Sequence, residues 1–197
     1  MKLTEIVFAS SNKGKIKEVS EIFAKLGIKI RPQLDFNVPD IEETGLTFVE
    51  NAILKARNCC ENTGLPALAD DSGLEVDALN GAPGIYSARY AGTNNDSQAN
   101  IDLLLENLQD TPKHKRTARF QCFMVLMRHA KDPVPILAQG SWEGLILLSQ
   151  QGTQGFGYDP IFYVPSEKCT AAELSADTKN KLSHRGKAFA LLQRQIS

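Results

Sequence analysis

The sequence has no long hydrophobic run. Its longest uninterrupted apolar stretch spans only residues 122–127, far short of the roughly 20 residues that a membrane-spanning helix requires. The N-terminal stretch MKLTEIVFASSNKGK lacks the continuous apolar core of a signal peptide. An excess of charge of one sign is also missing, because 22 Lys and Arg residues face 23 Asp and Glu residues. That balance argues against a broad nucleic-acid surface, so we expect contact with neither membrane nor nucleic acid.

The sequence also lacks paired cysteines. Cys59, Cys60, Cys122 and Cys169 show no C-x-x-C spacing and no metal-type grouping with histidine. Four free thiols are therefore expected, which is typical of the reducing cytoplasm. A chain of 197 residues can bury roughly 70% of its unfolded surface, enough to fold without disulfides or a metal. We expect residues 1–197 to form a single domain.

Two common nucleotide-binding signatures are missing. There is no G-x-G-x-x-G, and S-S-N-K-G-K at residues 10–15 is not a P-loop. A P-loop needs a glycine five positions before its Gly-Lys pair and a Ser or Thr directly after it, where this chain has Ala9 and Ile16. The stretch still joins a predicted strand to a predicted helix, and a helix start attracts anions. It is a candidate phosphate-binding turn, with a solvated helix start as the alternative.

Hydrophobic periodicity predicts alternating strands and helices in the first half and paired strands in the middle. T-F-V-E from Thr47 forms a capping box that opens a helix, whose polar face carries Asn51, Lys55 and Asn58 by i,i+4 and i,i+3 spacing. The other predicted elements are strands at 4–10, 28–32 and 161–164; a helix from Lys13 that stops at Gly27; a strand, acidic turn and second strand over 66–79; a helix at 97–108; strands at 117–130 and 135–148, the latter broken by Gly140 and Gly144; and a helix from His184. This order predicts an α/β fold, a mixed sheet with helices on both faces.

Two acidic pairs are candidate metal ligands. Glu42-Glu43 lies in a predicted turn, and Asp70-Asp71 lies at the end of a predicted strand. Converging carboxylates suit Mg²⁺, which also takes water and substrate phosphate as ligands. A further carboxylate can accept a proton from attacking water. An ordinary acidic loop is the alternative for the first pair. It is a weaker alternative for the second, because carboxylates beside an apolar strand need compensation by a cation.

Two further stretches carry groups suited to a nucleobase. In G-F-G-Y-D-P, residues 155–160, Phe156 or Tyr158 can stack on a base while the adjacent acid accepts hydrogen bonds. In L-S-H-R-G, residues 182–186, His184 and Arg185 are donors at a predicted helix start. A packed turn and a surface cap are the alternatives. Taken together, the lysine-bearing turn, the acidic pairs, the aromatic turn with its acid and the His-Arg donors favour an enzyme that acts on a nucleoside triphosphate with a divalent metal.

Five longer stretches show a resemblance across essentially the whole chain: SSNKGK, EETGLTFVENAILKA, ADDSGLEVDALNGAPGIYSARYAG, GFGYDPIF and LSHRG. Together they resemble the inosine/xanthosine triphosphate pyrophosphatase family. The resemblance implies an elongated mixed sheet flanked by helices, with two lobes and an active-site cleft between them. It also implies a homodimer, a Mg²⁺ requirement, and hydrolysis of dITP, ITP and XTP to the monophosphate and pyrophosphate, which keeps these bases out of DNA and RNA.

The resemblance further implies roles for individual residues. Asp71 would accept a proton from water, and Glu42 and Asp71 would associate with the metal. The residues implied in substrate binding are Ser10, Ser11, Asn12, Lys13, Gly14, Lys15 and Lys55 for the phosphates, and Ser72, Phe156, Gly157, Tyr158, Asp159, Lys179, His184 and Arg185 for contacts with the substrate, chiefly its base and sugar. The chain departs from the family pattern at Ser11 and Gln154, where glycine is usual.

Three rival functions stay open from the sequence. A related pyrophosphatase for modified pyrimidine triphosphates would differ in its substrates, and a nucleotide-sensing module would bind without turnover. A phosphate-transferring kinase is disfavoured because the P-loop Ser or Thr is absent.

Overall fold

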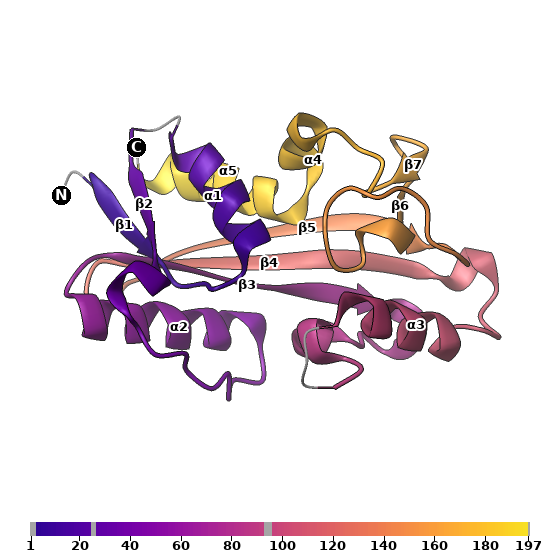
Figure 1. The fold of residues 1–197 in the computed structure, drawn as a ribbon, viewed down its shortest axis with the longest axis horizontal. Coiled ribbons are helices and arrows are strands. Elements are labelled where there is room, and N and C mark those ends of the chain that lie inside the picture. The colour runs from indigo at the N-terminus through magenta and orange to yellow at the C-terminus, as the bar shows by residue number, and fades with distance from the viewer. Residues whose placement is uncertain (1–2, 25–26, 93–95, 197) are drawn as a thin grey trace. The chain divides into compact units, whose positions relative to one another are not determined.

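A computed structural model describes residues 3–24, 27–92 and 96–196 (Figure 1). Its strands are β1 (Glu5–Phe8), β2 (Lys29–Pro32), β3 (Ala67–Val76), β4 (Thr117–Met127), β5 (Ile136–Ile146), β6 (Phe162–Val164) and β7 (Cys169–Thr170). Its α-helices are α1 (Lys13–Ala24), α2 (Phe48–Thr63), α3 (Ser97–Asn107), α4 (Ala176–Leu182) and α5 (His184–Ile196). Within the described residues the strands form one seven-stranded sheet in the order β2-β1-β3-β4-β5-β6-β7.

The sheet is mixed, as the sequence predicted. Strand β1 pairs in parallel with β2 and β3, whereas β6 pairs antiparallel with both β5 and β7. The fold is therefore α/β with a mixed sheet. None of the helices in the described ranges is long and apolar enough to cross a membrane.

The chain divides into two compact units. Unit 1 comprises residues 1–71, 123–139 and 188–197, and unit 2 comprises residues 72–122 and 140–187. The chain passes from one unit to the other four times: after Asp71 in β3, after Cys122 in β4, after Gln139 in β5 and after Lys187 in α5. Whether residues 1–197 fold as a single domain stays a prediction.

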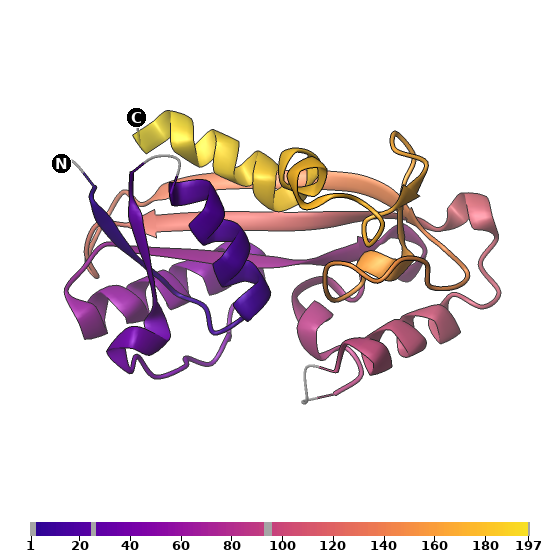
Figure 2. The same ribbon diagram turned by 45° about the horizontal axis from the view of Figure 1, so that its top comes forward.

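Unit 1 carries helices on both faces of its strands. Helix α2 covers one face, and α1 and α5 lie side by side on the other (Figures 1 and 2). On the α2 face, Ala52 and Ala56 pack against a buried cluster that includes Val7, Ala69 and Val125. On the other face, the ring of Phe23 in α1 meets the ring of Phe189 in α5 edge-on, with centroids 4.9 Å apart.

Unit 2 has an aromatic core. Residues of α3 pack with Phe120, Trp142 and Phe162 in one buried cluster. Gly144 makes room for this cluster, because a Cβ there would lie 2.5 Å from Phe162 Cζ and 2.6 Å from the Tyr163 carbonyl oxygen. The prediction that glycine breaks this strand is wrong: β5 runs continuously through Gly140 and Gly144, since close packing, not a turn, requires the second glycine.

The sequence-based elements agree with the structure at most positions. The capping box is confirmed, because the Thr47 side chain accepts from the Glu50 N–H and the Glu50 carboxylate accepts from the Thr47 N–H. The predicted end of the first helix falls partly on residues 25–26, which lie outside the described residues. Helix α4, capped by Ser175, was not predicted.

The predicted acidic turn within residues 66–79 is wrong. Asp70 and Asp71 lie in the middle of β3, which is continuous from Ala67 to Val76. Adjacent buried carboxylates disfavour a strand only when nothing compensates their charge, and here a lysine pairs with each.

Candidate active site

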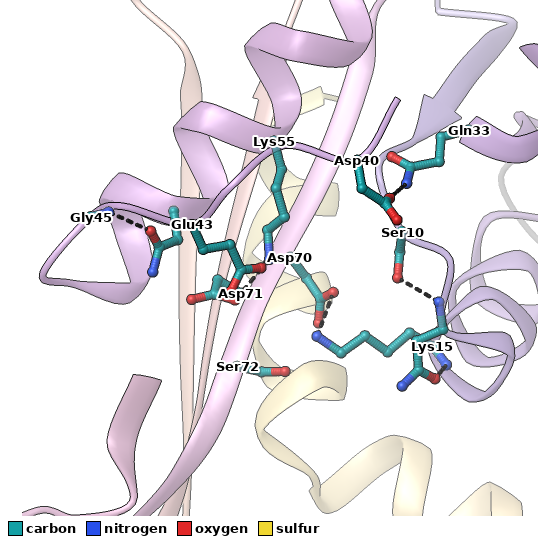
Figure 3. A network of polar contacts seen from close by, with 12 residues as sticks. Ser10, Lys15, Gln33, Asp40, Glu43, Gly45, Lys55, Asp70, Asp71 and Ser72 are labelled. Carbon is teal, nitrogen blue, oxygen red and sulfur yellow. Dashed lines mark hydrogen bonds and ion pairs between the residues drawn. The ribbon is translucent and has the colours of Figure 1, made fainter. Parts of the chain in front are cut away.

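The acidic pair of β3 meets lysines from two different helices. Successive residues of a strand point to opposite faces of the sheet, and the helices α1 and α2 cover those opposite faces in unit 1. The Lys15 ammonium of α1 lies 3.1 Å from Asp70 Oδ1, and the Lys55 ammonium of α2 donates to Asp71 Oδ1 across 2.7 Å (Figure 3). Asp70 and Asp71 are only 1% and 6% exposed, so both pairs are largely shielded from water.

The turn at residues 10–15 is organised by its own side chains. Ser10 Oγ accepts from the Asn12 N–H at 3.2 Å, and Asn12 Oδ1 accepts from the Lys15 N–H at 3.1 Å. The Asn12 carboxamide therefore occupies the capping position at the start of α1. Ser11, Asn12 and Lys13 are exposed, whereas Lys15 is half-buried against Asp70. A helix start with a nearby lysine suits a phosphate group.

Lys55 contacts two carboxylates at once. Its ammonium donates to Glu43 Oε1 at 2.9 Å as well as to Asp71 Oδ1. Burial acts to lower the pKa of Lys55, but the carboxylates of Asp71, Glu43 and Asp70 outweigh it, so the pKa lies above its ordinary value. Lys55 is therefore positively charged at neutral pH and can attract phosphate oxygens.

Asp71 combines the properties of a proton acceptor and an oxygen ligand. Burial raises the pKa of its carboxyl above the ordinary value, although Lys55 and Lys15 act to lower it. Its second oxygen, Oδ2, is buried and has no hydrogen-bond partner among the described residues. A buried carboxylate with an elevated pKa is typical of a catalytic base. The unpartnered oxygen is also the kind of hard donor that Mg²⁺ takes.

The acidic turn before α2 places its two glutamates differently. Glu43 reaches Lys55, whereas the Glu42 side chain is exposed. In the described part of the chain, no three His, Cys, Asp or Glu side chains are grouped as a metal site. The residues present still fit Mg²⁺ chemically, because that ion commonly takes one or two carboxylates and completes its shell with water and phosphate oxygens. The role of Glu42 as a ligand stays a prediction.

In unit 2, the G-F-G-Y-D-P loop is built around one carboxylate oxygen. Asp159 Oδ2 accepts from the Lys179 ammonium at 2.6 Å and from the Phe156 N–H at 2.8 Å. Gly155 has φ +80°, and a Cβ there would collide with the same oxygen. The Phe156 ring is 37% exposed, and the Lys179 nitrogen lies 4.9 Å from its centroid. The loop thus presents an aromatic face beside a cation.

Tyr158, two residues further on, points into the core of unit 2. It is 4% exposed, and its hydroxyl donates to the Ser87 carbonyl oxygen at 2.8 Å. Burial raises the pKa of this hydroxyl. Because the Tyr158 ring is packed in the core, Phe156 is the aromatic side chain of this loop that is available for stacking on a ligand. Gly157 between them has φ +59°, a conformation that glycine adopts without strain.

The junction between α4 and α5 holds the two predicted donors. The His184 ring stacks on Phe120 with centroids 4.9 Å apart. The Arg185 guanidinium donates to Ser72 Oγ at 3.1 Å and lies 5.9 Å from the Phe156 ring centroid. His184 and Arg185 are buried, and Ser72 is half-buried. In unit 2, therefore, Ser72, Phe156, Arg185 and Lys179 form one connected group.

Comparison with known proteins assigns the family. The profile of the Ham1 family matches residues 6–195. The chain belongs to the Ham1 family. It is 57% identical to the dITP/XTP pyrophosphatase of Thioalkalivibrio sulfidiphilus, over 98% of each chain. It is 53% identical to the dITP/XTP pyrophosphatase of Vibrio parahaemolyticus, over 99% of this chain and 98% of the relative. The solved structure of a HAM1 protein from Coxiella burnetii has a TM-score of 0.88 and 52% identity, covering 98% and 97% of the two chains.

Membership of the Ham1 family confirms the resemblance that the sequence motifs indicated. Within this Ham1-family chain, the structure brings Lys15, Lys55 and Asp71 together around β3 in unit 1. It adds Glu43 and Asp70, which the residue-by-residue assignment did not include. Both belong to the acidic pairs that the sequence offered as candidate metal ligands, but sequence spacing does not show that Glu43, rather than Glu42, reaches Lys55 or that Asp70 pairs with Lys15.

Proposed function

We propose that this protein hydrolyses deaminated purine nucleoside triphosphates, dITP, ITP and XTP, to the nucleoside monophosphate and pyrophosphate. The observation that carries the proposal is the pair of buried lysine–aspartate contacts at the middle of β3, Lys15 with Asp70 and Lys55 with Asp71. Cations held beside carboxylates suit a polyphosphate that must be both bound and attacked by water. The names of the relatives, dITP/XTP pyrophosphatase, support the same reaction.

In the proposed reaction, Asp71 accepts a proton from the attacking water. The water oxygen bonds to the α-phosphorus, and the bond from that phosphorus to the bridging oxygen breaks. Pyrophosphate leaves with the electron pair of that bond, and Lys15 and Lys55 hold its charge. Such reactions depend mainly on positioning and charge stabilisation, which the short contacts of Lys55 with Asp71 and Glu43 favour.

The same proposal includes a Mg²⁺ requirement. Asp71, with Glu42 or Glu43 as the nearby acid, would hold the ion. When bound, Mg²⁺ supplies positive charge that offsets the phosphate oxygens. We also infer a homodimer in the cytoplasm, the compartment that four free cysteines suit.

Base selection would come from the donors of unit 2. Hypoxanthine and xanthine carry an oxygen at position 6, where adenine carries an amino group. Donors such as His184 and Arg185 pair with that oxygen but face another donor in adenine. A buried donor left without an acceptor costs about 1–3 kcal/mol, or roughly ten- to a hundredfold in kcat/KM. The Phe156 face would support the base by stacking.

A substrate panel with product analysis tests this function. The purified protein is incubated with Mg²⁺ and dITP, ITP, XTP, ATP or GTP, and the products are separated by ion exchange. We expect monophosphate and pyrophosphate from the first three and little turnover of ATP. We expect the same of GTP, whose exclusion must depend on its 2-amino group because guanine shares the 6-oxygen, and no reaction of any substrate when a chelator removes the metal. Formation of a diphosphate and orthophosphate would contradict the proposed site of cleavage, and preferential turnover of modified pyrimidine triphosphates would favour the rival pyrophosphatase.

A further inference from the structure

Ser87 is a buried serine to which neither the family resemblance nor the proposed reaction gives a role. It lies in the short 3₁₀ helix Gly84–Arg89 of unit 2 and is 7% exposed. Its side chain and its backbone carbonyl are both hydrogen-bonded, and they contact different segments of the unit. A buried polar group that is satisfied in this way holds together the segments that it joins.

The Ser87 hydroxyl holds β3. Its oxygen accepts from the Leu74 N–H at 2.8 Å, and its proton is donated to the Gly84 carbonyl oxygen at 2.6 Å. Leu74 follows Ser72 by two residues in β3, so the two side chains point to the same face of the strand. The hydroxyl therefore fixes the stretch of β3 on which Ser72 accepts from the Arg185 guanidinium at 3.1 Å.

The Ser87 carbonyl holds the G-F-G-Y-D-P loop. Its oxygen accepts from the Tyr158 hydroxyl at 2.8 Å, and both residues are buried. Tyr158 follows Phe156 by two residues, and the Phe156 ring centroid lies 5.9 Å from the Arg185 guanidinium. Through its side chain and its carbonyl, Ser87 thus joins the two segments that Arg185 contacts.

These contacts form a closed circuit within unit 2. Arg185 contacts Ser72 of β3 and Phe156 of the loop, and Ser87 joins the same strand and the same loop by buried hydrogen bonds. Because hydrogen bonds are short and directional, the Ser87 contacts fix the separation of the strand from the loop. An arginine held between two fixed segments keeps one position and can place its donors accurately.

We propose that Ser87 is a positioning residue for base selection, which holds β3 and residues 155–160 at the spacing that lets Arg185 donate to the 6-oxygen. This inference rests on the proposed function. A displacement of about 1 Å within a site can cost roughly 10²-fold in rate. ITP depends on the hydrogen bond from Arg185, whereas ATP, with an amino group at position 6, does not. Loss of the Ser87 contacts should therefore affect ITP more than ATP.

Two substitutions break the connection at different points. Ser87→Ala removes the hydroxyl that contacts Leu74 and Gly84. Tyr158→Phe removes the donor to the Ser87 carbonyl and keeps the packed ring. If Ser87→Ala does not fold, Tyr158→Phe carries the same test.

Asn100→Ala is the matched control, because Asn100 fastens the same stretch of chain to α3. Its side chain accepts from the Ala91 N–H at 2.7 Å and donates to the Ala88 carbonyl oxygen at 3.1 Å. These two contacts involve neither β3 nor residues 155–160. The control therefore weakens the fastening of this stretch without breaking the connection through Ser87.

The measurements are kcat and KM for ITP and ATP, the inhibition constant of inorganic tripolyphosphate, and thermal unfolding. In Ser87→Ala and in Tyr158→Phe we expect the ratio of kcat/KM for ITP over ATP to fall roughly tenfold. Tripolyphosphate has no base, so its inhibition constant should stay within about threefold of the original. The double variant should lose no more of the ratio than the larger single effect, because both changes break one connection. Asn100→Ala should lower the midpoint of unfolding and keep the ratio.

A purely structural role has a different outcome. The midpoint of unfolding would fall in Ser87→Ala and Tyr158→Phe, and kcat would fall by the same factor for ITP and ATP, which leaves the ratio unchanged and overturns the proposal. An equal loss of the ratio in Asn100→Ala would also overturn it, because the effect would then belong to general loosening of unit 2.

Failure of the inference is distinguishable from failure of the proposed function. If the unchanged protein prefers ITP to ATP and both variants keep that preference, the inference falls and the proposed function stands. Absence of the preference in the unchanged protein would overturn the proposed base selection and the inference with it.

Discussion

Asp70 and Asp71 are consecutive residues of β3, yet each is paired with a lysine from a different helix. Lys15 of α1 contacts Asp70 at 3.1 Å, and Lys55 of α2 contacts Asp71 at 2.7 Å. Alternation along the strand sends the two carboxylates to opposite faces, which α1 and α2 cover in unit 1. The arrangement places a cation beside each of two adjacent buried carboxylates in the middle of β3.

Lys15 is expected to contribute to phosphate binding beyond its contact with Asp70. Because Lys15→Met alone leaves a buried carboxylate without its cation, the informative variant is Lys15→Met combined with Asp70→Asn, which removes both charges. We expect its KM for dITP to rise roughly ten- to a hundredfold, as for loss of one charge-assisted hydrogen bond. Lys17→Met, an exposed position of the same helix, is the control. A KM near that of the unchanged protein in the double variant would contradict this role.

Arg185 is expected to contribute to base selection. Its guanidinium lies beside Phe156 and Ser72 in unit 2, and in Arg185→Ala a donor suited to the 6-oxygen is lost. The ratio of kcat/KM for ITP over ATP should therefore shrink by roughly tenfold. Lys187→Ala, two residues further along α5 at an exposed position, should leave the ratio unchanged. An unchanged ratio in Arg185→Ala would remove Arg185 from base recognition.

Gly186 is expected to be required for the junction that presents His184 and Arg185. A Cβ at this position would collide with the Asn180 carbonyl oxygen of α4, and backbone has little freedom to move. Gly186→Ala should lower the free energy of unfolding by about 1–3 kcal/mol, despite the better helix propensity of alanine. Ala190→Ser, at an exposed position of α5, should change it by less than about 0.5 kcal/mol. Urea unfolding measures both, and equal stability of the two variants would show that the junction can relax.

Asp132 stabilises the turn between β4 and β5 in a pH-dependent way. The side chain of Arg128 donates to it at 2.6 and 2.8 Å, and the N–H groups of Arg128 and Val134 donate at 3.0 and 3.1 Å. The Arg128 side chain and these N–H groups hold the pKa of Asp132 well below its ordinary value. A depressed carboxyl pKa stabilises the folded state above the unfolded pKa of about 4, and this stability is lost as the pH falls toward the folded pKa.

Asp132→Asn tests that contribution. Because Arg128 is partly exposed and screened by solvent, we expect the free energy of unfolding at pH 7 to fall by only about 1 kcal/mol. The difference from the unchanged protein should narrow below pH 4, where the wild-type carboxylate loses its advantage over the neutral amide. Denaturant unfolding at pH 7 and pH 3 measures it. A difference that is the same at both pH values would mean that the charge of Asp132 plays no part.

Much of the fold could be predicted because local signals decide it. The capping box of Thr47 and Glu50 identified the start of α2, and the apolar period identified α3. The errors arose where distant residues override local preference. The sequence alone predicts that Gly144 breaks its strand, whereas in the structure the close packing of Phe162 requires a glycine there. It likewise predicts a turn at Asp70-Asp71, whereas a lysine beside each carboxylate allows both residues to lie in a strand.

In the candidate site, too, local motifs could be recognised from the sequence but contacts between distant residues could not. The residue types and their motifs indicated a triphosphate enzyme, since lysines, acids and an aromatic turn each suit one part of that ligand. Their mutual contacts could not be inferred. Nothing in the spacing distinguishes Glu43, which reaches Lys55, from exposed Glu42, or the exposed Phe156 ring from buried Tyr158.

The most direct test of the account is the turnover of dITP by Asp71→Asn. The amide has nearly the same shape as the carboxylate and keeps an oxygen that can accept from Lys55, but it cannot take a proton from water. We expect kcat to fall by about 10²-fold or more, while dITP binding, measured by equilibrium dialysis with the inactive variant, is retained. A kcat close to that of the unchanged protein would show that Asp71 is not the proton acceptor and would contradict the account at its centre.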